Sequence, residues 1–113
     1  MPFSTQFWDN LVIKSYKIIL KRKKESSLIH KNLGLAYVRI GKDKKAIRSF
    51  QRSIKYDKKC AESYYHLGMT YRRLGKIEDA LRCFTNYSKL LKINEKKKTY
   101  IDEVVEDLRL PDK

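Results

Sequence analysis

The chain has 113 residues, enough for one domain with a modest hydrophobic core, so a two-domain protein is not expected. Only four glycines and two prolines occur, which disfavours a turn-rich β fold and predicts an all-α protein. The formal net charge of +14 favours acidic proteins, nucleic acid or anionic lipid over basic partners, although compositional bias alone can also produce it.

Residues 1–26 are expected to form one N-terminal helix. Apolar side chains recur at helical spacing and predict a stripe that packs on the next segment: Trp8, Leu11, Val12, Tyr16, Ile19 and Leu20. Lys14 and Lys17 interrupt the apolar stretch, and the first ten residues lack a basic start. Neither a membrane span nor a signal peptide is therefore expected.

Residues 27–60 have the pattern of a helix pair. The first helix carries an apolar stripe of Ile29, Leu33, Tyr37 and Ile40. Gly41 is expected to end it, because a left-handed residue is needed there. Gly34 lies inside this helix at a cost of about 1 kcal/mol against Ala, which predicts close approach of the second helix, about Lys44 to Tyr56.

Residues 61–94 repeat the same pattern after a shift of 34 positions. The shift places Leu33, Gly34, Tyr37, Gly41, Ala46 and Phe50 on Leu67, Gly68, Tyr71, Gly75, Ala80 and Phe84. Leu67, Tyr71 and Leu74 form the matching stripe, and the second helix is expected from about Glu78 to Lys92. The small residues Ala46 and Ala80 are expected to face the paired helix.

Residues 95–113 are expected to form a capping helix and tail. An apolar stripe of Ile101, Val104, Val105 and Leu108 precedes Pro111 and would cover the open end of the second pair. The acidic side chains suit a polar outer face: Asp102, Glu103, Glu106 and Asp107. About six antiparallel helices follow, although one continuous helix through Ile93 to Glu95 is an open alternative.

The two copies of L-G-x-x-Y followed by A-x-x-x-F, 34 residues apart, closely resemble the tetratricopeptide repeat (TPR) family. The resemblance covers residues 27–94 and implies a short right-handed superhelix. Two features depart from the family pattern. His30 and Tyr64 replace the large aromatic residue that often precedes Leu-Gly, and Lys58 and Lys92 replace the closing Pro.

The resemblance also implies a binding surface, because the first helices of such repeats line a concave groove. Carried onto this sequence, the groove comprises Leu28, Lys31, Asn32, Leu35, Val38 and Arg39, then Glu62, Tyr65, His66, Met69, Arg72 and Arg73. Its apolar members offer adaptable packing, and its cations can pair with carboxylates. We therefore expect a non-catalytic protein-interaction module or adaptor for an acidic peptide or protein segment.

One family version of this groove, the carboxylate clamp for chaperone tails, is not expected. Lys31 stands at the first clamp position, but Leu35 and His66 occupy places where Asn is expected. A third full repeat is also missing. The partner is therefore expected to be another peptide, a helix or a folded neighbour.

The sequence contains no motif for enzyme catalysis, metal binding or cofactor binding, so none of these is expected. His30 and His66 lie at different repeat positions, and Cys60 and Cys83 lack metal-ligand or disulfide spacing, which suits a reducing, cytoplasmic setting. Two alternatives stay open. Nucleic acid would use the basic run at residues 21–24 but lacks a reading motif, and self-association or assembly into a larger complex would use Phe3, Phe7 and Trp8.

Overall fold

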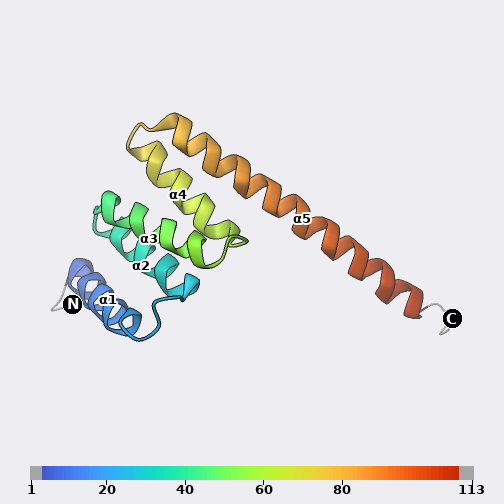
Figure 1. Ribbon diagram of the computed structural model, residues 1–113, viewed down its shortest axis with the longest axis horizontal. Coiled ribbons are helices and arrows are strands. Elements are labelled where there is room, and N and C mark those ends of the chain that lie inside the picture. Colours follow the sequence, from blue (N-terminus) through green and yellow to red (C-terminus); the bar gives the residue numbers. More distant parts are fainter. Residues whose placement is uncertain (1–3, 110–113) are drawn as a thin grey trace.

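The computed structural model describes the backbone of residues 4–109 and the side chains of residues 4–96, 99, 103 and 106. Over residues 4–109 the protein is all-α, as predicted, with no strand. Its helices are α1 (Thr5–Leu20), α2 (Ser27–Arg39), α3 (Asp43–Tyr56), α4 (Ala61–Arg73) and α5 (Ile77–Arg109) (Figure 1).

The helices stack in chain order. Each packs on the next, and short turns join α2 to α3 and α4 to α5 as antiparallel pairs (Figure 1). The first helices of the two pairs, α2 and α4, also touch each other. The architecture is therefore a helical repeat in which neighbouring units share one core.

Both helix-ending glycines adopt the predicted left-handed conformation, with φ of 78° at Gly41 and 77° at Gly75. In the first turn Gly41 N–H donates to the Val38 carbonyl at 3.0 Å, and Lys42 N–H donates to the Tyr37 carbonyl at 2.9 Å. The same two bonds recur around Gly75. These bonds satisfy carbonyl groups that the end of a helix leaves open.

The glycines inside α2 and α4 allow the predicted close helix approach. A Cβ atom on Gly34 would lie 2.5 Å from the Phe50 ring, and one on Gly68 would lie 2.7 Å from the Phe84 ring. No carbon atom packs that closely, so a side chain at either position would displace a ring. The aromatic residue of each repeat thus packs directly on the glycine of the same repeat.

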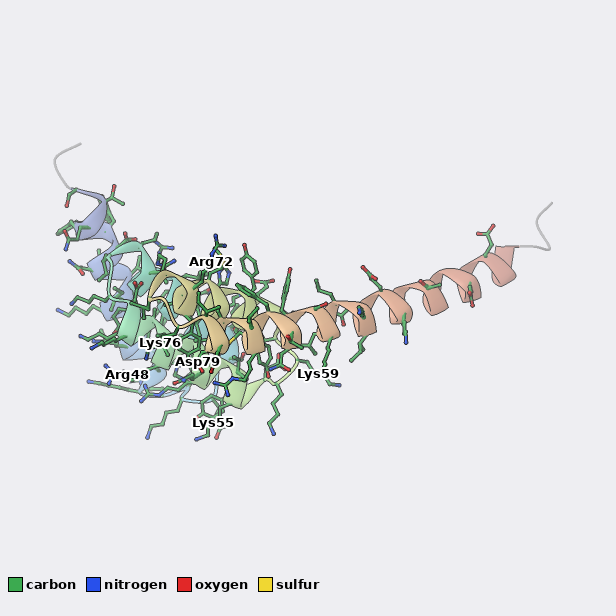
Figure 2. All side chains as sticks on the ribbon, turned by 90° about the horizontal axis from the view of Figure 1, so that it is seen from above. Arg48, Lys55, Lys59, Arg72, Lys76 and Asp79 are labelled. Atoms are coloured by element: carbon green, nitrogen blue, oxygen red, sulfur yellow. The ribbon has the colours of Figure 1, made fainter. Side chains whose placement is uncertain are left out.

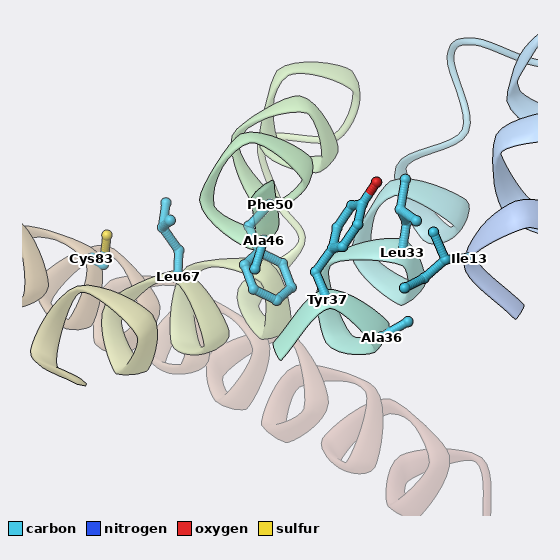
Figure 3. Close-up of a cluster of buried hydrophobic side chains, with 8 residues drawn as sticks. All are labelled: Ile13, Leu33, Ala36, Tyr37, Ala46, Phe50, Leu67 and Cys83. Carbon is cyan, nitrogen blue, oxygen red and sulfur yellow. The ribbon is translucent and has the colours of Figure 1, made fainter. Parts of the chain in front are cut away.

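One contiguous core runs through the stack (Figure 3). Leu33, Tyr37 and Leu67 are buried as predicted, and Ala46 is fully buried. Leu74, predicted for the stripe, is 40% exposed at the end of α4. All five helices contribute to this core: Ile13, Leu33, Ala36, Tyr37, Ala46, Phe50, Leu67 and Cys83.

The predicted packing face of α1 is correct for only half of its residues. Val12, Tyr16 and Leu20 pack against the core with Ile13, whereas Trp8, Leu11 and Ile19 are exposed. α1 carries two adjacent apolar stripes, and only one can face α2. The buried stripe begins with Asp9, which forms an ion pair with α2.

The C-terminal segment differs from the expected separate capping helix. α5 continues to Arg109, which is the alternative that the sequence left open, and in the described chain it packs only on α4 (Figure 1). Neither Gly nor Pro occurs between Gly75 and Pro111, and Lys92 stands where a Pro would close the repeat. The side chains of the predicted stripe at residues 101–108 lie outside those described, as does Pro111.

Candidate binding surfaces

The predicted groove residues lie on α2 and α4, which the structure brings side by side. Lys31 on α2 donates to the Glu62 carboxylate on α4 at 2.6 Å. That hydrogen bond, with the Lys31 charge, lowers the pKa of Glu62. We call this surface the groove face, defined by Leu28, Lys31, Asn32, Leu35, Val38, Arg39, Glu62, Tyr65, His66, Met69, Arg72 and Arg73.

Two further cations of the groove face are held by neighbouring helices. Arg39 donates to the Asp9 carboxylate on α1 at 2.8 Å, and Asp9 is only 7% exposed. Arg73 donates to Asp43 at the start of α3, also at 2.8 Å. Three of the four predicted cations are therefore engaged inside the protein, and Arg72 is exposed without an ion pair to any described carboxylate.

The apolar part of the groove face lies partly open to solvent. Leu35 and Met69 are half-buried, as is Asn32, while Tyr65 is 39% exposed. Met69 and Tyr65 are one helical turn apart on α4, so their side chains share a face. This face offers an adaptable apolar strip beside Arg72.

An aromatic cluster borders that strip. Tyr65 packs against the rings of His66, Phe84 and Tyr87, and His66 stacks on Phe50 with 5.8 Å between centroids. Burial lowers the pKa of His66. Sequence reasoning did not include Tyr87, although its position three residues after Phe84 on the predicted helix was a usable signal.

A second surface lies on the opposite side of α2 and was not predicted. At 3.6 residues per turn, His30, Leu33 and Tyr37 lie about half a turn from Lys31, Leu35 and Arg39. They line a cavity of about 560 Å³ bordered by α1 and α3. We call it the basic cleft, lined by Lys17, Leu20, Lys21, Lys24, His30, Leu33, Tyr37, Lys45, Arg48, Ser49, Arg52 and Tyr56.

The two surfaces face opposite ways. Figure 2 shows Arg72 of the groove face on one side of the molecule, and Arg48 of the basic cleft on the other. Within α3, Lys45, Arg48 and Arg52 recur every three or four residues, which places them on one helix face. That spacing, together with Lys17 in α1 and Lys21 directly after it, was the sequence signal for the cleft.

His30 sits at the base of the basic cleft and is 5% exposed. Its Nε2–H donates to the backbone carbonyl of Lys24 at 2.8 Å, and its ring stacks on Tyr56. Because the carbonyl can only accept, this bond fixes the proton on Nε2. Nδ1 is buried without a hydrogen-bond partner among the described residues, a state that costs about 1–3 kcal/mol.

The described residues offer no constellation for metal chemistry. No group of three His, Cys, Asp or Glu side chains there is placed to hold a metal ion. Cys60 and Cys83 are free thiols, and burial raises the pKa of Cys83. Across the described residues, none of the helices combines the length and apolar character that a membrane crossing requires.

Comparison with known proteins agrees with the helix pairs. A family model described as "TPR repeat" matches residues 34–75, and one described as "Tetratricopeptide repeat" matches residues 61–96. No curated protein matches the sequence. The second TPR of Spaghetti (RPAP3), solved with the HSP90 peptide SRMEEVD, is similar at a TM-score of 0.67 and 23% identity, over 69% of this chain and 72% of that one.

MamA structures are similar as well. A crystal structure of MamA has a TM-score of 0.73 at 20% identity over 74% of this chain, and MamA from Desulfovibrio magneticus RS-1 has 0.73 at 21% over 75%. This chain covers 49% and 48% of those structures, about half their length. At these identities the likeness concerns the fold. The two repeat models together match residues 34–96, more than half of the chain, and this match shows that the chain belongs to the tetratricopeptide repeat family.

Proposed function

We propose that this protein is a non-catalytic adaptor that holds a segment of another protein against its groove face. The TPR fold is a protein-interaction fold, and stacked helix pairs present an extended surface built by their first helices. The observation that carries the proposal is the partly open apolar pair of Tyr65 and Met69 beside Arg72 on α4, with half-buried Leu35 on the adjoining α2. The free thiols suit a reducing, cytoplasmic setting.

The pairing of Lys31, Arg39 and Arg73 refines the chemistry of the bound segment. Those cations already hold Glu62, Asp9 and Asp43, so they are poor grips for a partner's carboxylates. The segment we propose is apolar at its centre and carries an acidic residue opposite Arg72. The HSP90 peptide in the RPAP3 structure contains adjacent glutamates. Because Leu35 and His66 of this chain replace the clamp asparagines, we do not propose such a chaperone tail as the partner.

The test is cross-linking of the native protein in cells, followed by mass spectrometry and a direct affinity measurement with the partner found. Met69→Ser and Arg72→Glu are expected to weaken binding about tenfold or more if these side chains are central contacts. Lys76→Glu is the matched control, because Lys76 is an exposed cation in the turn after α4, outside the groove face (Figure 2). Equal loss in all three variants, or cross-links confined to other surfaces, would refute this binding site.

A second candidate function is self-association or assembly into a larger complex. Phe7 and Trp8 are exposed on α1, and Phe3 lies outside the described residues. The stronger support comes from α5, which exposes Leu81, Leu91 and Ile93 and packs only on α4 in the described chain. Sedimentation at rising concentration is the measurement, and a strict monomer would remove self-association.

A further inference from the structure

The basic cleft concentrates positive charge that the protein itself leaves unanswered. Its cations come from three chain segments: α1 with Lys17, the following loop with Lys21 and Lys24, and α3 with Lys45, Arg48 and Arg52. The described residues that line the cleft include no acidic side chain. None of the six cations has an ion pair with a carboxylate of the described chain.

Two of these cations also lie near the same aromatic ring. The Nζ atoms of Lys17 and Lys45 reach the Tyr37 ring from two different helices, at 5.8 and 5.9 Å from its centroid. The Tyr37 ring therefore has two positive charges near it, and an anion bound near both reduces their mutual repulsion. The arrangement therefore favours a ligand with several negative charges.

The loop that carries Lys21 and Lys24 is anchored to the cleft floor. His30 Nε2–H holds the Lys24 carbonyl at 2.8 Å, and the buried ring is braced by stacking on Tyr56. This contact fixes the loop backbone from which the Lys24 side chain extends, which reduces the ordering cost of binding.

The size and the aromatic contacts select the kind of anion. A cavity of about 560 Å³ falls in the range of small-molecule sites. Tyr37 is buried, and Tyr56 is already stacked on His30 with the Lys55 ammonium 5.6 Å from its ring. Tyr56 is 38% exposed, but one face of its ring is occupied by His30, so the cleft lacks the row of open rings on which single-strand binding proteins stack successive bases.

We propose that the basic cleft binds a compact, soluble small molecule that carries several phosphate groups. Arg48 and Arg52 grip phosphate oxygens from α3, where the planar guanidinium suits bidentate contacts. The opposite wall of the cleft contacts the ligand through Lys17, Lys21 and Lys24. This site lies across α2 from the groove face, so it is independent of protein-segment binding there.

The experiment is titration calorimetry of the full chain with inositol hexakisphosphate as the probe, at physiological salt. We expect saturable binding of one probe per chain. Arg48→Glu combined with Arg52→Glu is expected to weaken binding about tenfold or more, because two charge-assisted grips become repulsive. Lys58→Glu with Lys59→Glu changes the net charge equally on exposed residues outside the cleft, and less than threefold weakening is expected there by screening.

Several outcomes would overturn the proposal. They are no saturable binding at physiological salt, equal weakening by the two double variants, or preferential and competing binding of duplex RNA or an acidic peptide. Binding to vesicles that contain phosphoinositides without binding to the soluble probe would also overturn it. Circular dichroism checks that each variant folds, and Lys21→Glu with Lys24→Glu tests the opposite wall independently of α3.

Discussion

The groove face and the basic cleft lie on opposite sides of α2 and contain the same kinds of cation in opposite electrostatic situations. On the groove face, Lys31 and Arg39 each hold a carboxylate from a neighbouring helix. On the cleft side, no described carboxylate reaches the cations of α1 and α3. The net charge of +14 is therefore unevenly distributed. At the groove face, acidic residues form ion pairs that join neighbouring helices, whereas the basic cleft retains a positive field that attracts an anionic ligand.

The strongest way to break this comparison is to remove the residue that supports both sides. Phe50 is fully buried and packs on Gly34, so Phe50→Ala should cost about 3–5 kcal/mol of unfolding free energy. Urea denaturation followed by circular dichroism measures it. Phe84→Ala, the equivalent change in the second repeat, should cost less because Phe84 is half-buried. Equal losses would contradict a core centred on α2 and α3.

A smaller effect should separate the two sides directly. Arg39→Met leaves the buried Asp9 carboxylate without its ion-pair partner and should cost about 1–3 kcal/mol. Arg48→Met removes a cation with no described partner and should stay within about 0.5 kcal/mol. Thermal unfolding of both variants provides the comparison. Asp9→Asn in the Arg39→Met background should restore part of the loss, and a purely additive cycle would argue against the pair.

The smallest effect concerns salt. Because the cleft cations repel one another, the melting temperature of the unmodified protein should rise as salt screens them. Arg48→Gln with Arg52→Gln should reduce this dependence and stabilise the protein by about 0.5 kcal/mol at low salt, as expected for exposed charges. Lys58→Gln with Lys59→Gln is the control. A melting temperature that falls with salt would show that ion pairs of the groove side outweigh the repulsion.

The repeat itself could be predicted from sequence because each of its key residues has a local reason. Gly41 and Gly75 predict helix ends, because a helix end needs a residue in the left-handed conformation. Gly34 and Gly68 predict close helix approach, because only close packing offsets the cost of Gly inside a helix. The matching spacing of the two copies then assigned the helix pairs. Prediction succeeded where one residue type has one physical use.

The electrostatics of the surfaces could not be predicted in the same way. Whether Arg39 is free or paired depends on Asp9, which lies 30 positions earlier in the chain and is brought near only by the stacking of α1 on α2. The basic cleft likewise needs α1 and α3, which do not adjoin in sequence. The separate C-terminal helix was wrongly predicted for another reason. The apolar stripe at residues 101–108 indicated a helix, but no residue before that stripe required the preceding helix to end.

The continuous α5 also has a mechanical consequence. A helix of 33 residues is about 50 Å long at 1.5 Å per residue, and the molecule extends 60 Å along its longest axis. A flexible linker of the same length would let its ends wander over many separations, whereas a helix fixes one. The continuous α5 therefore fixes the distance between the repeats and any group that contacts the chain near Arg109 (Figure 1).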